Sequence, residues 1–131
     1  MVDSEDERAI LVEHRKVLAE MVLRLFSHWR LTETEKAVML GLDATSEFEV
    51  DDVFDGLTPR KEAAIRERIG HLLAIHRLLR SQFPQNREVA YSWMHAPNRA
   101  FGGQSPVMVV KQRGLEGLLL IRAYLARSAD V

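Results

Sequence analysis

The chain has 131 residues, of which 47% are hydrophobic and 28% charged; this composition favours one globular domain, or two very small ones sharing a core, over a disordered chain. Cysteine is absent, which excludes disulfide bonds and thiolate zinc sites and fits a reducing cytoplasm. The net charge of −1 hides an asymmetry, because residues 1–56 hold 14 acidic and 6 basic side chains whereas residues 57–131 hold 5 and 12, so the two halves are suited to different surroundings or partners.

We expect a cytoplasmic protein with neither a secretory signal nor a membrane partner. Residues 1–7 are acidic, where a signal would be basic and then apolar. The longest aliphatic run, residues 118–121, is far shorter than the roughly 20 residues that cross a bilayer.

A long helix is predicted over about residues 5–29. Its apolar residues recur in steps of seven, four, three and four, and so form one stripe: Leu11, Leu18, Val22, Leu25 and Trp29. We interpret the stripe as core, with a homodimer held by this helix as the alternative.

Two short helices are predicted after the long one. Thr32 and Glu35 have the spacing of a capping box, which would begin a helix over about residues 33–40 that ends at Gly41. A further helix is predicted over residues 46–55. Together they have the shape of a helix-turn-helix. Because residues 43–56 contain no Lys or Arg, the second helix is poorly suited to approach DNA phosphates.

The second half predicts four more helices. The longest begins at Thr58-Pro59 and ends at about Phe83, and its apolar stripe alternates in steps of four and three. The others cover about residues 86–94, 105–114 and 115–127. No stretch alternates with period two, so no sheet is expected and the fold class is an all-α helical bundle. A seam near residues 56–59 divides the chain into regions 1–57 and 58–131.

No constellation predicts an enzyme, a metal site or a cofactor. His71 and His76 are five residues apart, whereas metal-binding pairs on a helix are four apart. Ser92 and His95 lack a nucleophile elbow and an orienting carboxylate. The acidic residues between 43 and 55 lack the spacing of a calcium loop.

The segment from Trp93 to Gly114 is the most distinctive of the chain. Trp93 would anchor the end of a helix, Pro97-Asn98 would turn the chain, and Gly102-Gly103 would allow close packing or positive φ. Ser105-Pro106 would begin the next helix. The residues alone leave two interpretations open: a well-specified interhelical loop, or a rigid loop that presents its side chains to a partner.

The pattern of Trp, Pro-Asn, a bulky apolar residue, Gly-Gly, a spacer, Pro and a short apolar helix ending in Gly114 resembles the toxin-binding domain of the Xre/MbcA/ParS antitoxins. Upstream, Leu31-Thr32, Glu35 and Leu40-Gly41-Leu42 are similar to the Xre-like helix-turn-helix of that family. The resemblance extends over roughly residues 20–128.

The resemblance implies an antitoxin of a type II toxin–antitoxin system. Its partner would be a RES-domain toxin that consumes or transfers ADP-ribose from NAD, and the antitoxin would obstruct the toxin's active-site cleft without any cofactor of its own. A homodimer or a higher hetero-oligomer with the toxin is expected. Many members also repress their own operon, so a DNA-binding autorepressor is the alternative; the acidic segment 46–55 departs from that role.

Carried over to this sequence, the resemblance implies two groups of residues. The toxin-binding group comprises Asn98, Arg99, Phe101, Gly102, Gly103, Gln104, Arg122 and Arg127. Phe101 would be an apolar anchor, and the arginines would occupy a cleft built for phosphates or bond its rim. The group that supports the shape of the loop comprises Trp93, Pro97, Ser105, Pro106 and Gly114.

Overall fold

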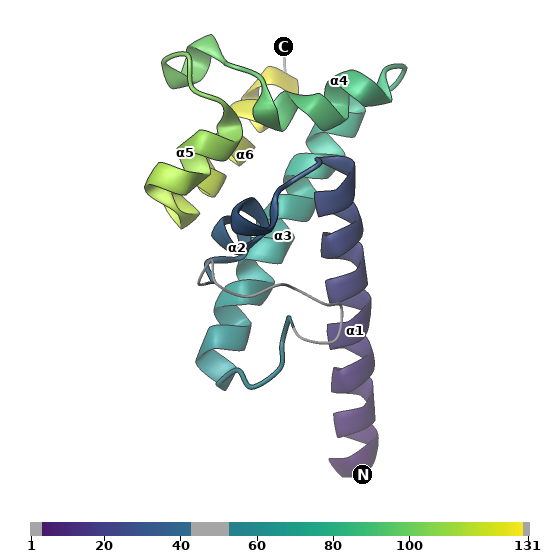
Figure 1. Cartoon of the computed structure of the whole chain (residues 1–131). Coiled ribbons are helices and arrows are strands. Elements are labelled where there is room, and N and C mark those ends of the chain that lie inside the picture. The colour runs from purple at the N-terminus through teal and green to yellow at the C-terminus, as the bar shows by residue number, and fades with distance from the viewer. Residues whose placement is uncertain (1–3, 43–52, 130–131) are drawn as a thin grey trace.

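The computed structural model describes residues 4–42 and 53–129, and within these ranges the chain is helical with no strand (Figure 1). The elements in chain order are α1 (Ser4–His28), α2 (Glu33–Leu40), α3 (Pro59–Gln82), α4 (Arg87–Ser92), η1 (Trp93–His95), η2 (Arg99–Phe101), α5 (Pro106–Arg113) and α6 (Leu115–Ala129). The all-α prediction is confirmed. The predicted helix 46–55 falls mainly outside the described residues, and its described end, residues 53–55, belongs to a turn.

Local capping chemistry sets most helix boundaries. The capping box of α2 is present: the Thr32 hydroxyl accepts from the Glu35 amide, and the Glu35 carboxylate accepts from the Thr32 amide at 2.8 Å. Thr58 caps α3 and Ser105 caps α5 by the side-chain hydroxyl alone, which accepts from the amides of Lys61 and Met108 respectively, and each cap is followed by proline at the first helical position. These short-range bonds explain why the boundaries could be predicted.

The turn between α1 and α2 is a Schellman motif with an unusual residue. The Leu31 amide donates to the Phe26 carbonyl and the Arg30 amide to the Ser27 carbonyl. The motif needs a left-handed residue, and Arg30 takes that position with φ +54°. At the end of α2 the same position is held by Gly41, φ +71°, which adopts it without side-chain strain.

α3 is the centre of the bundle, and it contacts α1, α2, α4 and α6, while α5 packs on α6 and α2 (Figure 1). The buried residues from both halves of the chain form one cluster. In the predicted stripe of α3, Ile65, Ile69, Leu72 and Leu79 are buried, and Ile75 joins them. His76 and Phe83 lie at the edge and are half-buried.

The stripe of α1 is core only toward its C-terminal end. Val22, Leu25 and Trp29 are buried, whereas Leu11 is 46% exposed. The first turns of α1 extend past the start of α3 (Figure 1), so they lack this helix as a packing partner. The interpretation of the whole stripe as core therefore fails at its N-terminal end.

Arg68 joins the central helix to α2. Its guanidinium lies 3.4 Å from the Val38 carbonyl and 3.5 Å from that of Met39, where the C-terminal carbonyls of α2 lack helical partners. Burial lowers the pKa of Arg68, although neighbouring Glu67 opposes this effect. A Cβ on Gly41 would lie 2.7 Å from the guanidinium carbon of Arg68. Glycine at position 41 therefore allows both the positive φ and the close approach of the Arg68 guanidinium.

Candidate functional site

The loop between η1 and α5 is closed on Asn98. The Asn98 carbonyl accepts from the amides of Phe101 (3.0 Å) and Gly103 (2.9 Å), and the Asn98 amide donates to the Gln104 carbonyl. The side-chain oxygen of Asn98 accepts from the Ala100 amide at 2.9 Å, which caps η2. Asn98 therefore holds the loop in one conformation.

The glycine pair of this loop is required by backbone conformation. Gly102 has φ +67° and Gly103 φ +87°, values that side-chain-bearing residues rarely adopt. An added Cβ on either residue would meet nothing within 4 Å. The Gly102-Gly103 pair is therefore needed for its positive φ angles and not for close packing.

An aromatic cluster fastens the loop to the last helix. The Phe101 ring packs edge-on against Tyr124 of α6 at 5.3 Å between centroids and against Trp93 at 6.4 Å. Trp93 and Tyr124 are stacked at 6.3 Å. All three side chains are half-buried, so Phe101 is held rigidly while part of its surface stays accessible. Such a rigid, partly exposed aromatic residue is suited to anchor a partner.

Beside this cluster lies a hollow of about 420 Å³ between the loop, α5 and α6. We call it the Phe101 hollow; its lining residues are Ala100, Phe101, Gln104, Val109, Gln112, Arg113, Leu120, Tyr124 and Arg127. Among the described residues, none that lines it is acidic. Across one side, the Gln104 side-chain amide donates to the Gln112 side-chain oxygen at 3.1 Å.

The hollow brings together three of the residues predicted to bind toxin, Phe101, Gln104 and Arg127. Arg99 and the two glycines are exposed on the same loop. Sequence reasoning missed Arg113 and Tyr124. Tyr124 could have been found, since it precedes Arg127 by three residues and therefore shares its helix face.

Arg122 lies apart from the other predicted toxin-binding residues. Five residues separate it from Arg127, which places the two on different sides of a helix. Its guanidinium donates to the ring nitrogen Nδ1 of His71 on α3 at 2.8 Å, so this ring nitrogen carries no proton. Arg122 does not line the Phe101 hollow, so the structure does not bring it together with Phe101, Gln104 and Arg127.

The residues predicted to support the loop occupy structural positions. The Ser105 hydroxyl accepts from the Met108 amide at 3.2 Å, and Pro106 is buried at the start of α5. Gly114 has φ +59° and ψ −131° between α5 and α6, a conformation open essentially to glycine alone. Pro97 is exposed at the turn before Asn98.

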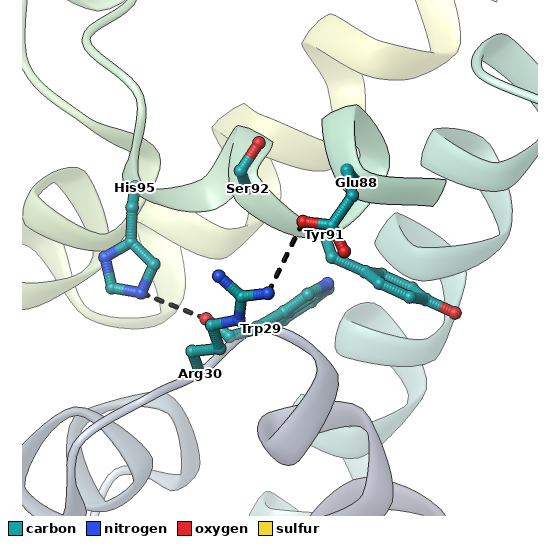
Figure 2. Close-up of a pocket in the computed structure, with 6 residues that line it drawn as sticks. All are labelled: Trp29, Arg30, Glu88, Tyr91, Ser92 and His95. Carbon is teal, nitrogen blue, oxygen red and sulfur yellow. Dashed lines mark hydrogen bonds and ion pairs between the residues drawn. The ribbon is translucent and has the colours of Figure 1, made fainter. Parts of the chain in front are cut away.

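A second, smaller hollow of about 140 Å³ marks the joint between the α1–α2 turn and α4–η1 (Figure 2). His95 reaches across it, with Nε2 3.1 Å from the Trp29 carbonyl, so this nitrogen must carry the proton. Arg30 pairs with Glu88 at 3.4 Å across the same joint. The Ser92 hydroxyl donates to the Val89 carbonyl, and so it is not directed at His95 as a nucleophile paired with a base would be.

The described residues contain no group of three or more His, Cys, Asp or Glu side chains that could hold a metal ion. In the same part of the chain, no helix has the length and apolar character needed to cross a membrane.

Residues 78–129 match the family model described as the antitoxin Xre/MbcA/ParS C-terminal toxin-binding domain. This segment, from the end of α3 to the end of α6, contains the whole of the loop and the Phe101 hollow. The match starts well after the residue-20 boundary of the resemblance seen in the sequence. No curated protein and no solved structure matches the chain. The domain supports an antitoxin role with a toxin as the partner, and it suggests a regulator rather than a catalyst.

Proposed function

We propose that this protein is the antitoxin of a type II system, that it binds a RES-domain toxin which consumes NAD, and that it occludes the active-site cleft of that toxin. One observation carries the proposal: the matched toxin-binding segment holds a rigid loop with a partly exposed aromatic residue beside an open, basic hollow. The antitoxin itself would need no cofactor, and it would act in the cytoplasm.

The contact surface is proposed to be the loop and the Phe101 hollow. Phe101 is the apolar anchor, with Gln104 and Arg127 beside it in the hollow. Arg99 and the exposed Gly102-Gly103 turn form the rim, and Asn98 maintains the shape of the loop through its hydrogen bonds. Arg122 can take part only as a separate contact, because it pairs with His71 on another side of α6.

The test begins with the gene next to this one, which we expect to encode a RES-domain protein. The wild-type chain should co-purify with that protein, suppress its consumption of NAD and protect cells that express it. The double variant Arg99→Glu with Phe101→Ala should lose all three effects. Arg77→Glu is the matched charge control, since Arg77 is exposed on α3 and its side chain forms no hydrogen bond or ion pair with a described residue. A double variant that still protects cells would refute this surface, and a wild-type chain that never binds the toxin would refute the function.

We propose that the two regions of the chain have different roles: region 58–131 binds the toxin, and region 1–57 mediates self-association. Ile10, Val17 and Met21 lie on one face of α1, since they are spaced by seven and four, and are 44–52% exposed. An antiparallel pair of α1 helices centred on Val17 would bury this face. It would also bring the acidic first turn of each copy near the basic end of the other, which contains Arg24 and His28. Val17→Glu with Met21→Glu should convert a dimer to a monomer in light scattering; a wild-type monomer would refute the pairing.

Repression of its own operon is the second candidate function. Residues 57–131 hold 12 basic and 5 acidic side chains, a balance that favours contact with phosphates. A gel-shift titration against the upstream DNA, at rising salt and with and without toxin, tests it. Specific binding at about 150 mM salt would support repression, since non-specific contacts weaken steeply with salt.

A further inference from the structure

No described acidic side chain neutralises the charge of the Phe101 hollow. Arg113 at the end of α5 and Arg127 on α6 both line it, and neither forms an ion pair with a described residue. Elsewhere, Arg15 and Arg66 both pair with Glu62. Two unpaired guanidinium groups beside one hollow attract carboxylates, which they can bind through paired hydrogen bonds.

Part of the lining of the hollow is apolar and reaches the surface of α6. Phe101, Tyr124 and Leu120 line it. Leu120 is 37% exposed, and the adjacent Leu119 is 44% exposed. The volume of about 420 Å³ lies within the range of sites that enclose a bulky apolar group. A partner therefore gains most by inserting an apolar side chain between the two arginines.

The glutamine pair adds a polar edge suited to a peptide. Once the Gln104 amide has donated to Gln112, the Gln104 oxygen and the Gln112 amide keep one free acceptor and at least one free donor. A peptide backbone offers the complementary N–H and C=O groups. A nucleic acid fits less well, because protein–nucleic acid interfaces are more polar than a hollow lined by Phe101, Leu120 and Tyr124.

We propose that the Phe101 hollow binds an acidic, amphipathic peptide segment of the toxin, in which a bulky apolar side chain is flanked by carboxylates. The apolar side chain packs between Phe101, Leu120 and Tyr124, and the carboxylates pair with Arg113 and Arg127. This inference rests on the proposed function, since it specifies the chemistry of the toxin surface that the antitoxin binds.

The test compares charge reversal in the Phe101 hollow with charge reversal on α3. The double variant Arg113→Glu with Arg127→Glu should weaken toxin binding roughly 100-fold, because each change replaces an attraction by a repulsion in a partly desolvated contact. Arg77→Glu, on the exposed surface of α3, should leave the dissociation constant within about threefold. The neutral variant Arg113→Gln with Arg127→Gln should weaken binding less and should reduce its dependence on salt. Circular dichroism verifies that each variant is folded.

Fluorescent 15-residue peptides that tile the toxin identify the segment directly. The expected binder contains an apolar residue between acidic residues, and it loses affinity for the Arg113→Glu and Arg127→Glu chain. A single-stranded DNA 15-mer is the competing probe, and displacement of the peptide by DNA at 150 mM salt would overturn the choice of a peptide. If the double reversal binds toxin as the wild type does while Arg99→Glu with Phe101→Ala does not, this inference fails and the antitoxin function stands. If the folded wild-type chain does not bind toxin at all, the function itself fails.

Discussion

Gly117 of α6 lies close against the backbone of α5. Adding a single methyl group at this position tests the close approach. A Cβ added at this position would lie 2.7 Å from the Val109 carbonyl oxygen and 3.0 Å from the Val110 Cα. Both atoms belong to the backbone of α5, so neither can rotate away. Gly70, in the exposed middle of α3, is the matched control, because a Cβ there meets nothing within 4 Å.

The two alanine variants should change stability in opposite directions. In both helices alanine gains about 0.8–1 kcal/mol of helix propensity over glycine. At Gly70 this gain is the whole effect, so Gly70→Ala should raise the free energy of unfolding by up to about 1 kcal/mol. At Gly117 the overlap has the character of overpacking, which costs about 1–3 kcal/mol. With two backbone atoms at 3.0 Å or less we expect the upper part of this range, and so a net loss of about 1–2 kcal/mol.

Urea unfolding followed by circular dichroism measures both variants against the wild type. The midpoints should separate, with Gly117→Ala below and Gly70→Ala above, and with unchanged slopes. Gly117→Ala should also weaken toxin capture, because α5 and α6 together line the Phe101 hollow. If Gly117→Ala proved as stable as Gly70→Ala, the two helices could not be as close as the structure places them, and the account of their packing would be wrong.

Four further predictions concern the fold. Ile121→Ala, at a side chain with 0% exposure, should cost about 2–5 kcal/mol of unfolding free energy, whereas Leu119→Ala on the exposed face of α6 should stay within about 0.5 kcal/mol; urea titration measures both. Thr32→Ala removes the capping box of α2 and should lower the same free energy by about 0.5–2 kcal/mol, while Thr32→Ser should restore most of it. Arg30→Gly removes the strain of a left-handed backbone at a residue with a side chain, so it should raise the thermal midpoint by an amount that corresponds to about 1 kcal/mol. The gain should outweigh the loss of the exposed ion pair with α4. A lower midpoint would show that the backbone at Arg30 is not strained. Burial lowers the pKa of His76, so the folded state binds this proton less readily than the unfolded chain does. The free energy of unfolding should therefore fall as pH falls from about 6.5 through the folded pKa. In unfolding titrations between pH 7.5 and 5, His76→Gln should show a shallower decline than the wild type.

Much of the candidate site was predictable because its loop is fixed by short-range bonds. Asn98, Gly102 and Gly103 are named by the sequence pattern, and the structure explains them through the cap of η2 and two positive φ angles. The all-α class follows from the same local chemistry, since helical periodicity and caps such as Thr58 before proline depend only on neighbours in the chain.

The separation of Arg122 from Arg127 was also contained in the sequence, because it follows from helical geometry alone. It was missed because both residues are basic and fall near the end of the last helix. Exposure was harder to predict. Leu11 belongs to the apolar stripe of α1, yet it is 46% exposed. The first turns of α1 extend past the start of α3 and lack this helix as a packing partner (Figure 1).

By itself, then, the sequence determined which segments are helical, how most of them begin and end, and which loop resembles a toxin-binding motif. The tertiary structure alone decided that Phe101, Arg113 and Tyr124, from three separate elements, meet around one hollow. It also decided that Gly117 must lack a side chain, because the backbone of α5 occupies that space. The physical reason is that caps and periodicity act between neighbours in the chain, whereas a hollow and a close helix contact depend on how distant segments pack.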